Sequence, residues 1–259
     1  MRERRLVSMH DMHIAALEVS LTPENWSGPV TIRSALDGRV VNVGAQLHRR
    51  FSNRHLEPVF SEAVDDTGVL LLVRTNQSRL YVAEAGRTDV HVNSKRVDAE
   101  RSLIDEPGYI GHEVTFNVVQ GQTITVETVV ALYTSRDHGI SEPALEARKA
   151  IRRAGAFDTL LADHVRTWKQ LWRRFDVHIA PVQPGKLNVL LLLRLNMLHL
   201  LQTTSPHSIG LDIGVPARGW TGEPYQGHVF WDELFIFPFL NYRMPDHTVA
   251  VDVPLSPVG

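Results

Sequence analysis

The sequence predicts an α+β protein in which an antiparallel β-sandwich precedes a helical part. Residues 1 to about 141 contain short runs of β-branched and apolar residues separated by Gly, Asn and Asp. From residue 142 the apolar positions recur at helical spacing, and a very apolar segment follows at 187–204. Strands followed by helices indicate separate domains rather than an alternating α/β fold.

The strands occupy the first part of the chain. GPVTIRSALDGRVVNV, residues 28–43, has β-branched residues on both sides of Asp37-Gly38, a dipeptide that supplies the positive φ angles of a tight hairpin turn. The apolar runs at 67–76 and 79–86 are typical of short strands. Residues 113–135 then alternate apolar and polar side chains on either side of a turn at Gln120-Gly121. This pattern favours a sandwich.

Two helices are predicted next. PALEARKAIRRA forms the first, and Gly155 separates it from a second over DTLLADHVRTWKQLWRRF. In the second, one stripe carries the apolar residues Leu161, Val165, Trp168, Trp172 and Phe175. Aromatic residues at this spacing are usually buried, so we expect the tryptophans to pack in a core.

The segment LNVLLLLRLNMLHLLQTT, residues 187–204, resembles a membrane span only superficially. Arg194, Asn196 and His199 interrupt it, and it is shorter than the ~20 apolar residues that a spanning helix needs. A helix that is apolar nearly all round is better explained as the inner helix of a larger helical assembly.

Composition excludes several classes of function. The formal net charge of -2 gives no electrostatic reason to expect nucleic acid or an anionic membrane as a partner. The absence of cysteine excludes disulfides, zinc–thiolate sites and cysteine nucleophiles. No signal peptide is evident, so we expect a cytoplasmic protein.

Motifs for metals and nucleotides are weak. His10, Asp11 and His13 place three potential ligands within four residues. On a strand His10 and His13 would point to opposite faces, so we expect no metal site. There is no phosphate-binding glycine loop, which leaves a nucleotide cofactor without support.

The stretch GHVFWDELFIFPF, residues 227–239, places carboxylates inside the most aromatic run of the chain. It ends a long Gly- and Pro-rich loop between two apolar helices, where a polar ligand would be held. The indole of Trp231 could cover the C–H face of a sugar ring, and the carboxylate of Asp232 could accept hydrogen bonds from two hydroxyls. The alternative is that Asp232 caps the following helix while Trp231 only packs.

The string ARGWTGEPYQGHVFWDE, followed by Pro-Phe-Leu, resembles the start of the catalytic domain of glycoside hydrolase family 65. Residues 25–42 resemble a strand pair of the family's N-terminal sandwich, and 195–206 resemble the first helix of its (α/α)6 barrel. The resemblance implies an N-terminal β-sandwich domain at 1–141, incomplete at its start, and a helical linker at 142–180. It implies the truncated beginning of the (α/α)6 catalytic barrel at 181–259.

The family contains phosphorylases of maltose, trehalose and kojibiose as well as acid trehalases. By this resemblance Trp231 and Asp232 bind the glucosyl unit, and Arg218 and His228 line the same loop. Trp220 stands where an aliphatic residue is expected. Pro224 stands where a small one is usual, so the loop is expected to differ in shape. The acid that follows the pair in many relatives lies one residue later than Glu233, to which no role is transferred.

The resemblance also defines the expected chemistry. Inverting cleavage of an α-linked glucose disaccharide needs a carboxylic acid and, opposite it, activated water or inorganic phosphate. In the family the acid lies downstream of the aromatic motif, so we expect no catalytic residue in this chain. We expect no cofactor other than phosphate as co-substrate, and a possible homodimer in the full-length enzyme. The chain would thus be a fragment, with a carbohydrate-binding module or a non-functional remnant as alternatives.

Overall fold

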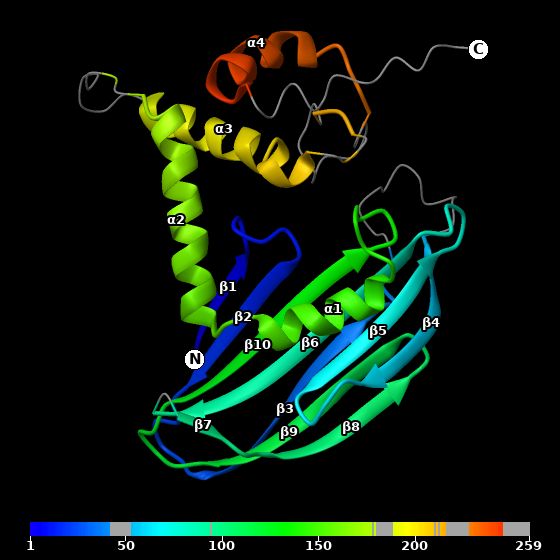
Figure 1. The fold of residues 1–259 in the computed structure, drawn as a ribbon. Coiled ribbons are helices and arrows are strands. Elements are labelled where there is room, and N and C mark those ends of the chain that lie inside the picture. Colours follow the sequence, from blue (N-terminus) through cyan, green and yellow to red (C-terminus); the bar gives the residue numbers. More distant parts are fainter. Residues whose placement is uncertain are drawn as a thin grey trace. The chain divides into compact units, whose positions relative to one another are not determined.

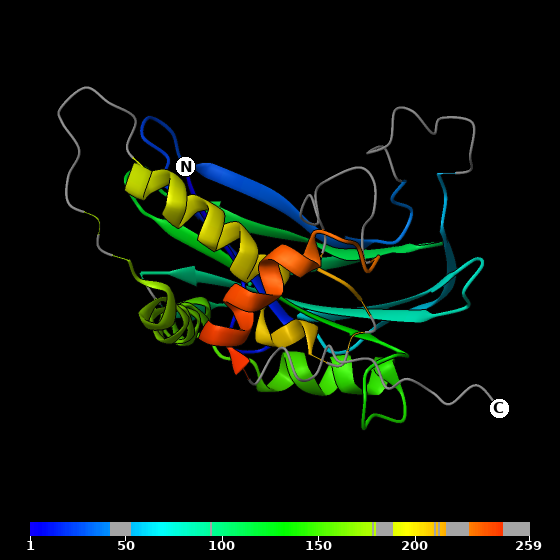
Figure 2. The same cartoon turned by 90° about the horizontal axis from the view of Figure 1, so that it is seen from above.

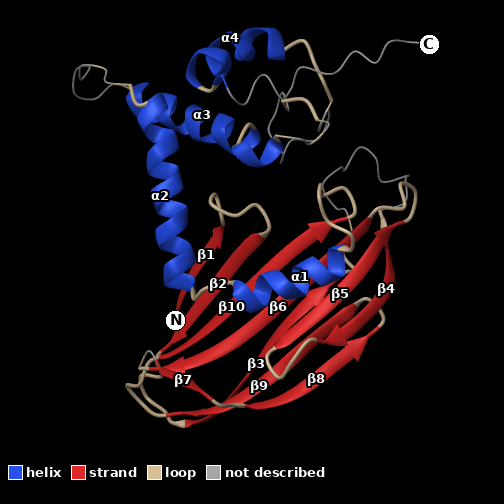
Figure 3. Ribbon diagram, viewed as in Figure 1, coloured by secondary structure: helices blue, strands red, loops and turns tan. Residues whose placement is uncertain are grey.

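The computed structural model describes residues 1–41, 53–93, 95–177, 179, 189–209, 211, 213–215 and 228–245. The chain divides into two compact units, Met1–His164 and Val165–Gly259. Strands make up most of the first unit and helices follow them in the chain (Figure 3). The antiparallel sandwich predicted from the sequence is confirmed. The finer boundaries at residues 141 and 180 stay a prediction.

Two antiparallel sheets form the sandwich of the first unit (Figure 1). Among the described residues the larger sheet has the order β1-β2-β10-β6-β5-β4, with β7 paired to the end of β6, and the smaller has the order β3-β9-β8. The larger sheet comprises β1 (Arg2–Val7), β2 (Ile14–Leu21), β4 (Leu56–Ala63), β5 (Gly68–Thr75), β6 (Tyr81–Val92), β7 (Lys95–Val97) and β10 (Ile124–Thr134). The smaller comprises β3 (Gly28–Asp37), β8 (Glu100–Glu106) and β9 (Tyr109–Val118).

Strand β5 of the larger sheet is buried on both faces, which explains its continuous apolar run. Leu70 and Leu72 belong to a cluster that includes helix α1 (Pro143–Arg153), whereas Leu71 and Val73 pack with Ile110 of the smaller sheet. Successive side chains of a strand point to opposite faces, so a strand covered twice has no polar side. Each fully buried leucine contributes about 1.5–3 kcal/mol.

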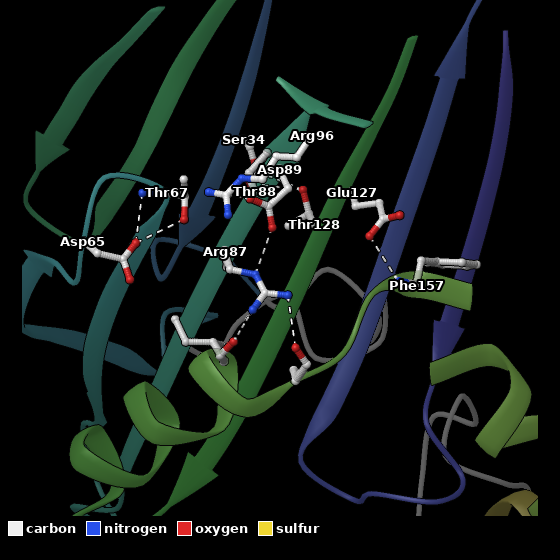
Figure 4. A network of polar contacts seen from close by, with 12 residues as sticks. Ser34, Asp65, Thr67, Arg87, Thr88, Asp89, Arg96, Glu127, Thr128 and Phe157 are labelled. Carbon is white, nitrogen blue, oxygen red and sulfur yellow. Dashed lines mark hydrogen bonds and ion pairs between the residues drawn. The ribbon is translucent and has the colours of Figure 1, made fainter. Parts of the chain in front are cut away.

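Helix α1 lies along the outer face of β5, β6 and β10 (Figure 2). Its buried residues Ala144, Ala147 and Ile151 recur every three or four positions, so one face of the helix packs on the sheet. Arg87 of β6 holds the end of this helix: Nη1 donates to the Ile151 carbonyl at 2.7 Å and Nη2 to the Ala154 carbonyl at 3.2 Å (Figure 4). A cation at the carboxyl end of a helix also interacts favourably with the helix dipole.

Helices build the second unit. Helix α2 (Phe157–Phe175) begins in the first unit and ends in the second, which also contains α3 (Val189–Thr203), a 3-10 turn (Pro206–Ser208) and α4 (Glu233–Arg243). Phe175 of α2 packs edge to face against Phe239 of α4, with ring centroids 5.6 Å apart. No helix among the described residues is long and apolar enough to cross a membrane.

The predicted apolar stripe of α2 is only partly buried. Phe175 is fully buried, Trp168 and Trp172 are half-buried, and Val165 is exposed. Helix α3 buries only Met197 and Leu201.

The hairpin predicted at Asp37-Gly38 is wrong. β3 pairs along its whole length with β9, and Gly38 does not adopt a positive φ angle. A Cβ on Gly38 would lie 2.5 Å from Cγ1 of Val73, so the glycine is needed for close packing. The Asp37 carboxylate accepts a hydrogen bond from the Arg39 amide at 2.9 Å and so stabilises the turn at residues 38–39.

The strand placement assumed for the first histidines is also wrong. Residues 8–13 form the turn between β1 and β2, in which the Ser8 hydroxyl accepts hydrogen bonds from the amides of His10 and Asp11. His13 stacks on Tyr133 with ring centroids 3.7 Å apart. Local side-chain hydrogen bonds of this kind compete with continuation of a strand.

Candidate functional site

The predicted sugar-binding pair, Trp231 and Asp232, lies at the start of α4 and is called the clamp below. Trp231 precedes the helix and the residue is 65% exposed, with Phe230 and Phe235 in edge-to-face contact at ring-centroid distances of 6.3 and 6.5 Å. The indole therefore has apolar surface available to a ligand.

Asp232 occupies the position of the helix cap, but its side chain does not act as one. The residue has helical φ and ψ angles of -58° and -26°, and its carboxylate makes no capping hydrogen bond. Its carbonyl accepts a hydrogen bond from the Phe235 amide at 3.1 Å, as part of the tight turn that opens the helix. The half-buried carboxylate has no hydrogen-bond partner among the described residues, so its oxygens are available as acceptors.

Glu233 has a structural contact that the sequence analysis did not assign. It is 4% exposed, and its Oε1 accepts a hydrogen bond from the Val215 amide at 2.8 Å. Gly214 lies so close that a Cβ there would be 2.4 Å from the same oxygen and 2.5 Å from the His228 carbonyl. Glu233 therefore ties the segment 213–215 to the start of α4. The sequence signal for a structural role of Glu233 was its position as an acid in the first turn of a helix.

The remaining predicted residues precede Trp231 in the chain. His228 is exposed three residues before Trp231. Arg218, together with Trp220 and Pro224, lies outside the described residues.

A separate hollow of about 430 Å³ in the second unit is lined by none of the described site residues, Trp231, Asp232 and His228. Lys169, Trp172, Arg173, Asp176 and Arg194 form its walls. Arg194 and Asp176 are ion-paired across it at 3.1 Å, and both are nearly half exposed. Trp231, Asp232 and His228 are neighbours in the sequence, and none of them lines this hollow.

Comparison with known proteins finds several relatives. The chain is 40% identical over 245 residues to an uncharacterized glycosyl hydrolase of Mycobacterium tuberculosis, covering 95% of this chain and 18% of the relative. It is 28% identical over 252 residues to a kojibiose phosphorylase of Halothermothrix orenii, covering 93% of this chain and 30% of that enzyme. An α,α-trehalose phosphorylase of Thermoanaerobacter brockii is 28% identical over 259 residues, covering 96% and 32%. The chain therefore spans less than a third of each relative's length.

The fold has a solved counterpart. A structure assigned to a kojibiose phosphorylase of the human microbiome superposes with a TM-score of 0.70 at 18% identity, covering 95% of this chain and 30% of that one. Residues 1–171 match the model of the glycosyl hydrolase family 65 N-terminal domain, and residues 194–252 match that of the central catalytic domain. The resemblance inferred from the aromatic motif is thereby confirmed, and the chain belongs to glycosyl hydrolase family 65.

Proposed function

We propose that the chain is part of an inverting enzyme that cleaves α-linked glucose disaccharides of the maltose, trehalose or kojibiose type. The observation that carries the proposal is its family membership, combined with an exposed indole next to a carboxylate that has no partner among the described residues at the start of α4. The characterised relatives named above are disaccharide phosphorylases.

In the proposed site, Trp231 and Asp232 hold the glucosyl unit. The exposed indole face packs against the C–H surface of the ring, and the two carboxylate oxygens of Asp232 accept hydrogen bonds from neighbouring hydroxyls. His228 and Arg218 complete the same loop. Such contacts place the bond to be cleaved relative to groups supplied by the rest of the catalytic domain.

The chemistry that follows is an expectation from the family. A glutamic acid outside these 259 residues protonates the leaving oxygen, and phosphate or water attacks the opposite face of the sugar. We assign no catalytic residue, metal or cofactor to this chain, and phosphate would enter as a co-substrate. The helices after residue 181 would form the beginning of the (α/α)6 barrel.

Two measurements on the full chain test the proposal. Calorimetry with glucose, maltose, trehalose and kojibiose is expected to show one binding component that Trp231→Ala removes, whereas Tyr242→Ala, an exposed aromatic change on the same helix, leaves that component intact. Identical isotherms for wild type and Trp231→Ala would refute the clamp. In assays with phosphate, we expect no β-glucose 1-phosphate, and measurable product would refute the assignment of the general acid to another part of the enzyme.

The second candidate function is a carbohydrate-binding module without catalysis. The same carboxylate of Asp232 and exposed indole of Trp231 favour it, because both bind sugar without requiring turnover. The test joins this chain to the remaining catalytic domain and measures sugar binding and cleavage together. Binding without any cleavage would support the binding module over the enzyme.

A further inference from the structure

The sandwich of the first unit contains a polar hollow that is separate from the clamp residues. Its cavity volume is about 520 Å³, within the range of about 300–1,000 Å³ that small-molecule sites occupy. The turn after β4 supplies Asp65 and Asp66, the segment from β7 to β8 supplies Arg96, Asp98 and Arg101, and β9 supplies His112. We call it the sandwich pocket.

Two side chains of the pocket, His112 and Arg101, keep hydrogen-bonding capacity that the described residues do not use. His112 is only 6% exposed and has no hydrogen-bond partner among the described residues. Arg101 donates from Nη2 to the Thr88 carbonyl at 2.8 Å, but its Nη1 is buried without a partner in the described part of the chain. The ring nitrogens of His112 are not among the buried side-chain atoms that lack a partner, so they are reachable from the pocket and can bond to a ligand there.

The arginines next to the pocket are held by neighbouring charges. Asp89 lies between Arg87 and Arg96, at 3.0 Å from each guanidinium (Figure 4). Arg96 is 57% exposed at its side chain and also lines the pocket, so it keeps donors free for a ligand. The site is therefore prearranged by contacts made within the larger sheet.

The charge balance decides the class of ligand. The pocket offers the cations Arg96 and Arg101 and the carboxylates Asp65, Asp66 and Asp98. An anion would be repelled by three aspartates, and a divalent cation would be repelled by two arginines. Among the described residues no group of three or more His, Asp or Glu side chains could hold a metal ion. A neutral polyol both donates and accepts hydrogen bonds, so it matches this mixture of donors and acceptors.

The apolar part of the lining favours a sugar among polyols. Val97, Ala99 and Leu103 contribute aliphatic surface beside the charged groups, and Leu103 is 49% exposed. A pyranose ring presents C–H faces to such a surface while its hydroxyls point to the rim. We propose that the sandwich pocket binds a neutral mono- or disaccharide, independently of the Trp231–Asp232 clamp.

Hydrogen exchange on the full chain, in the Trp231→Ala background, tests this proposal with glucose and maltose at millimolar concentration. This background removes binding at the clamp, so failure of the clamp and failure of the pocket are separately visible. We expect sugar to slow exchange at residues 63–67 and 96–103. The absence of protection in both segments would overturn the proposal.

A blocking variant provides the matched control. Leu103→Arg places a long side chain into the pocket from an exposed position and should weaken sugar affinity by about tenfold or more. Val119→Arg, at another exposed apolar position of the same unit, should leave the affinity unchanged. Equal affinities of the two variants would refute the proposal. Protection of the same segments by inorganic phosphate but not by sugar would show an anion site and would equally refute it.

Discussion

Replacing Arg87 with methionine tests how α1 is attached to the sandwich. Arg87 is about one-fifth exposed at its side chain and donates two hydrogen bonds to carbonyls at the end of α1. Methionine keeps most of the aliphatic stem and removes only the donors and the charge.

The expected magnitude follows from these contacts. A hydrogen bond from a charged donor contributes about 1.5–3 kcal/mol, and water replaces part of each bond at the open helix end. Arg87 Nε also lies 3.0 Å from Asp89 Oδ2, but without hydrogen-bond alignment, so we give this ion pair less weight. We expect Arg87→Met to lower the free energy of unfolding by about 2–4 kcal/mol.

Urea denaturation followed by circular dichroism measures this change. The control is Arg79→Met, because the Arg79–Glu57 ion pair is exposed at 59% and 44% and should contribute about 0–1 kcal/mol. A double-mutant cycle with Asp89→Asn separates the ion pair from the carbonyl bonds. If Arg87→Met and Arg79→Met shift the midpoint equally, the proposed attachment of α1 is wrong.

Three further predictions concern packing, pH and the loop before α4. Gly111→Ala should lower the free energy of unfolding by about 1–3 kcal/mol or more, because a Cβ would lie 2.4 Å from both a side chain and a carbonyl of the paired strand. Gly111→Ser should lower it at least as much, and an unchanged thermal midpoint in either variant would contradict this close packing. Burial first, and then Arg101, lower the pKa of His112 below its usual 6.5, so on acidification the unfolded chain gains a proton that the folded chain does not. As the pH falls below 6.5, the free energy of unfolding should therefore decrease by up to about 1.4 kcal/mol per pH unit. His112→Gln should reduce that slope in urea titrations at pH 5–7. An equal slope in the variant would refute the attribution of this pH dependence to His112. Glu233→Ala should free the Val215 amide and speed its hydrogen exchange by about five- to thirtyfold. Glu233→Gln keeps an acceptor and should give a smaller effect. Unchanged exchange in Glu233→Ala would contradict the proposal that Glu233 ties residues 213–215 to the start of α4.

Local turn signals predicted some connections correctly and others not. The Gln120-Gly121 turn is confirmed, with Gly121 at a φ of 77°. The strands that it joins, β9 and β10, nevertheless lie in different sheets. Asp37-Gly38 has an equally good hairpin composition, but β3 pairs with β9 instead of with the segment that follows it. A short turn motif specifies chain reversal, whereas the partner strand depends on contacts far apart in sequence.

The candidate site was predictable in part. An aromatic residue beside an acid at 231–232 was visible as a motif, and the family comparison supports its context. The contact of Glu233 with Val215 was not predictable, because it spans 18 residues and depends on how the loop folds back. The sandwich pocket was not predictable either, since its walls come from three separate segments whose residues are individually ordinary.

The sequence by itself determined that strands precede helices, the presence of helix α1 and membership of the family, because each depends on local periodicity or on a contiguous motif. Only the tertiary structure decided which strands pair and which polar groups meet. Burial on both faces of β5 removes the alternation that would have indicated its orientation, and the juxtaposition of Arg101, His112 and Asp65 arises from closure of two sheets. Contacts between distant segments depend on the packing of whole elements, which no local pattern encodes.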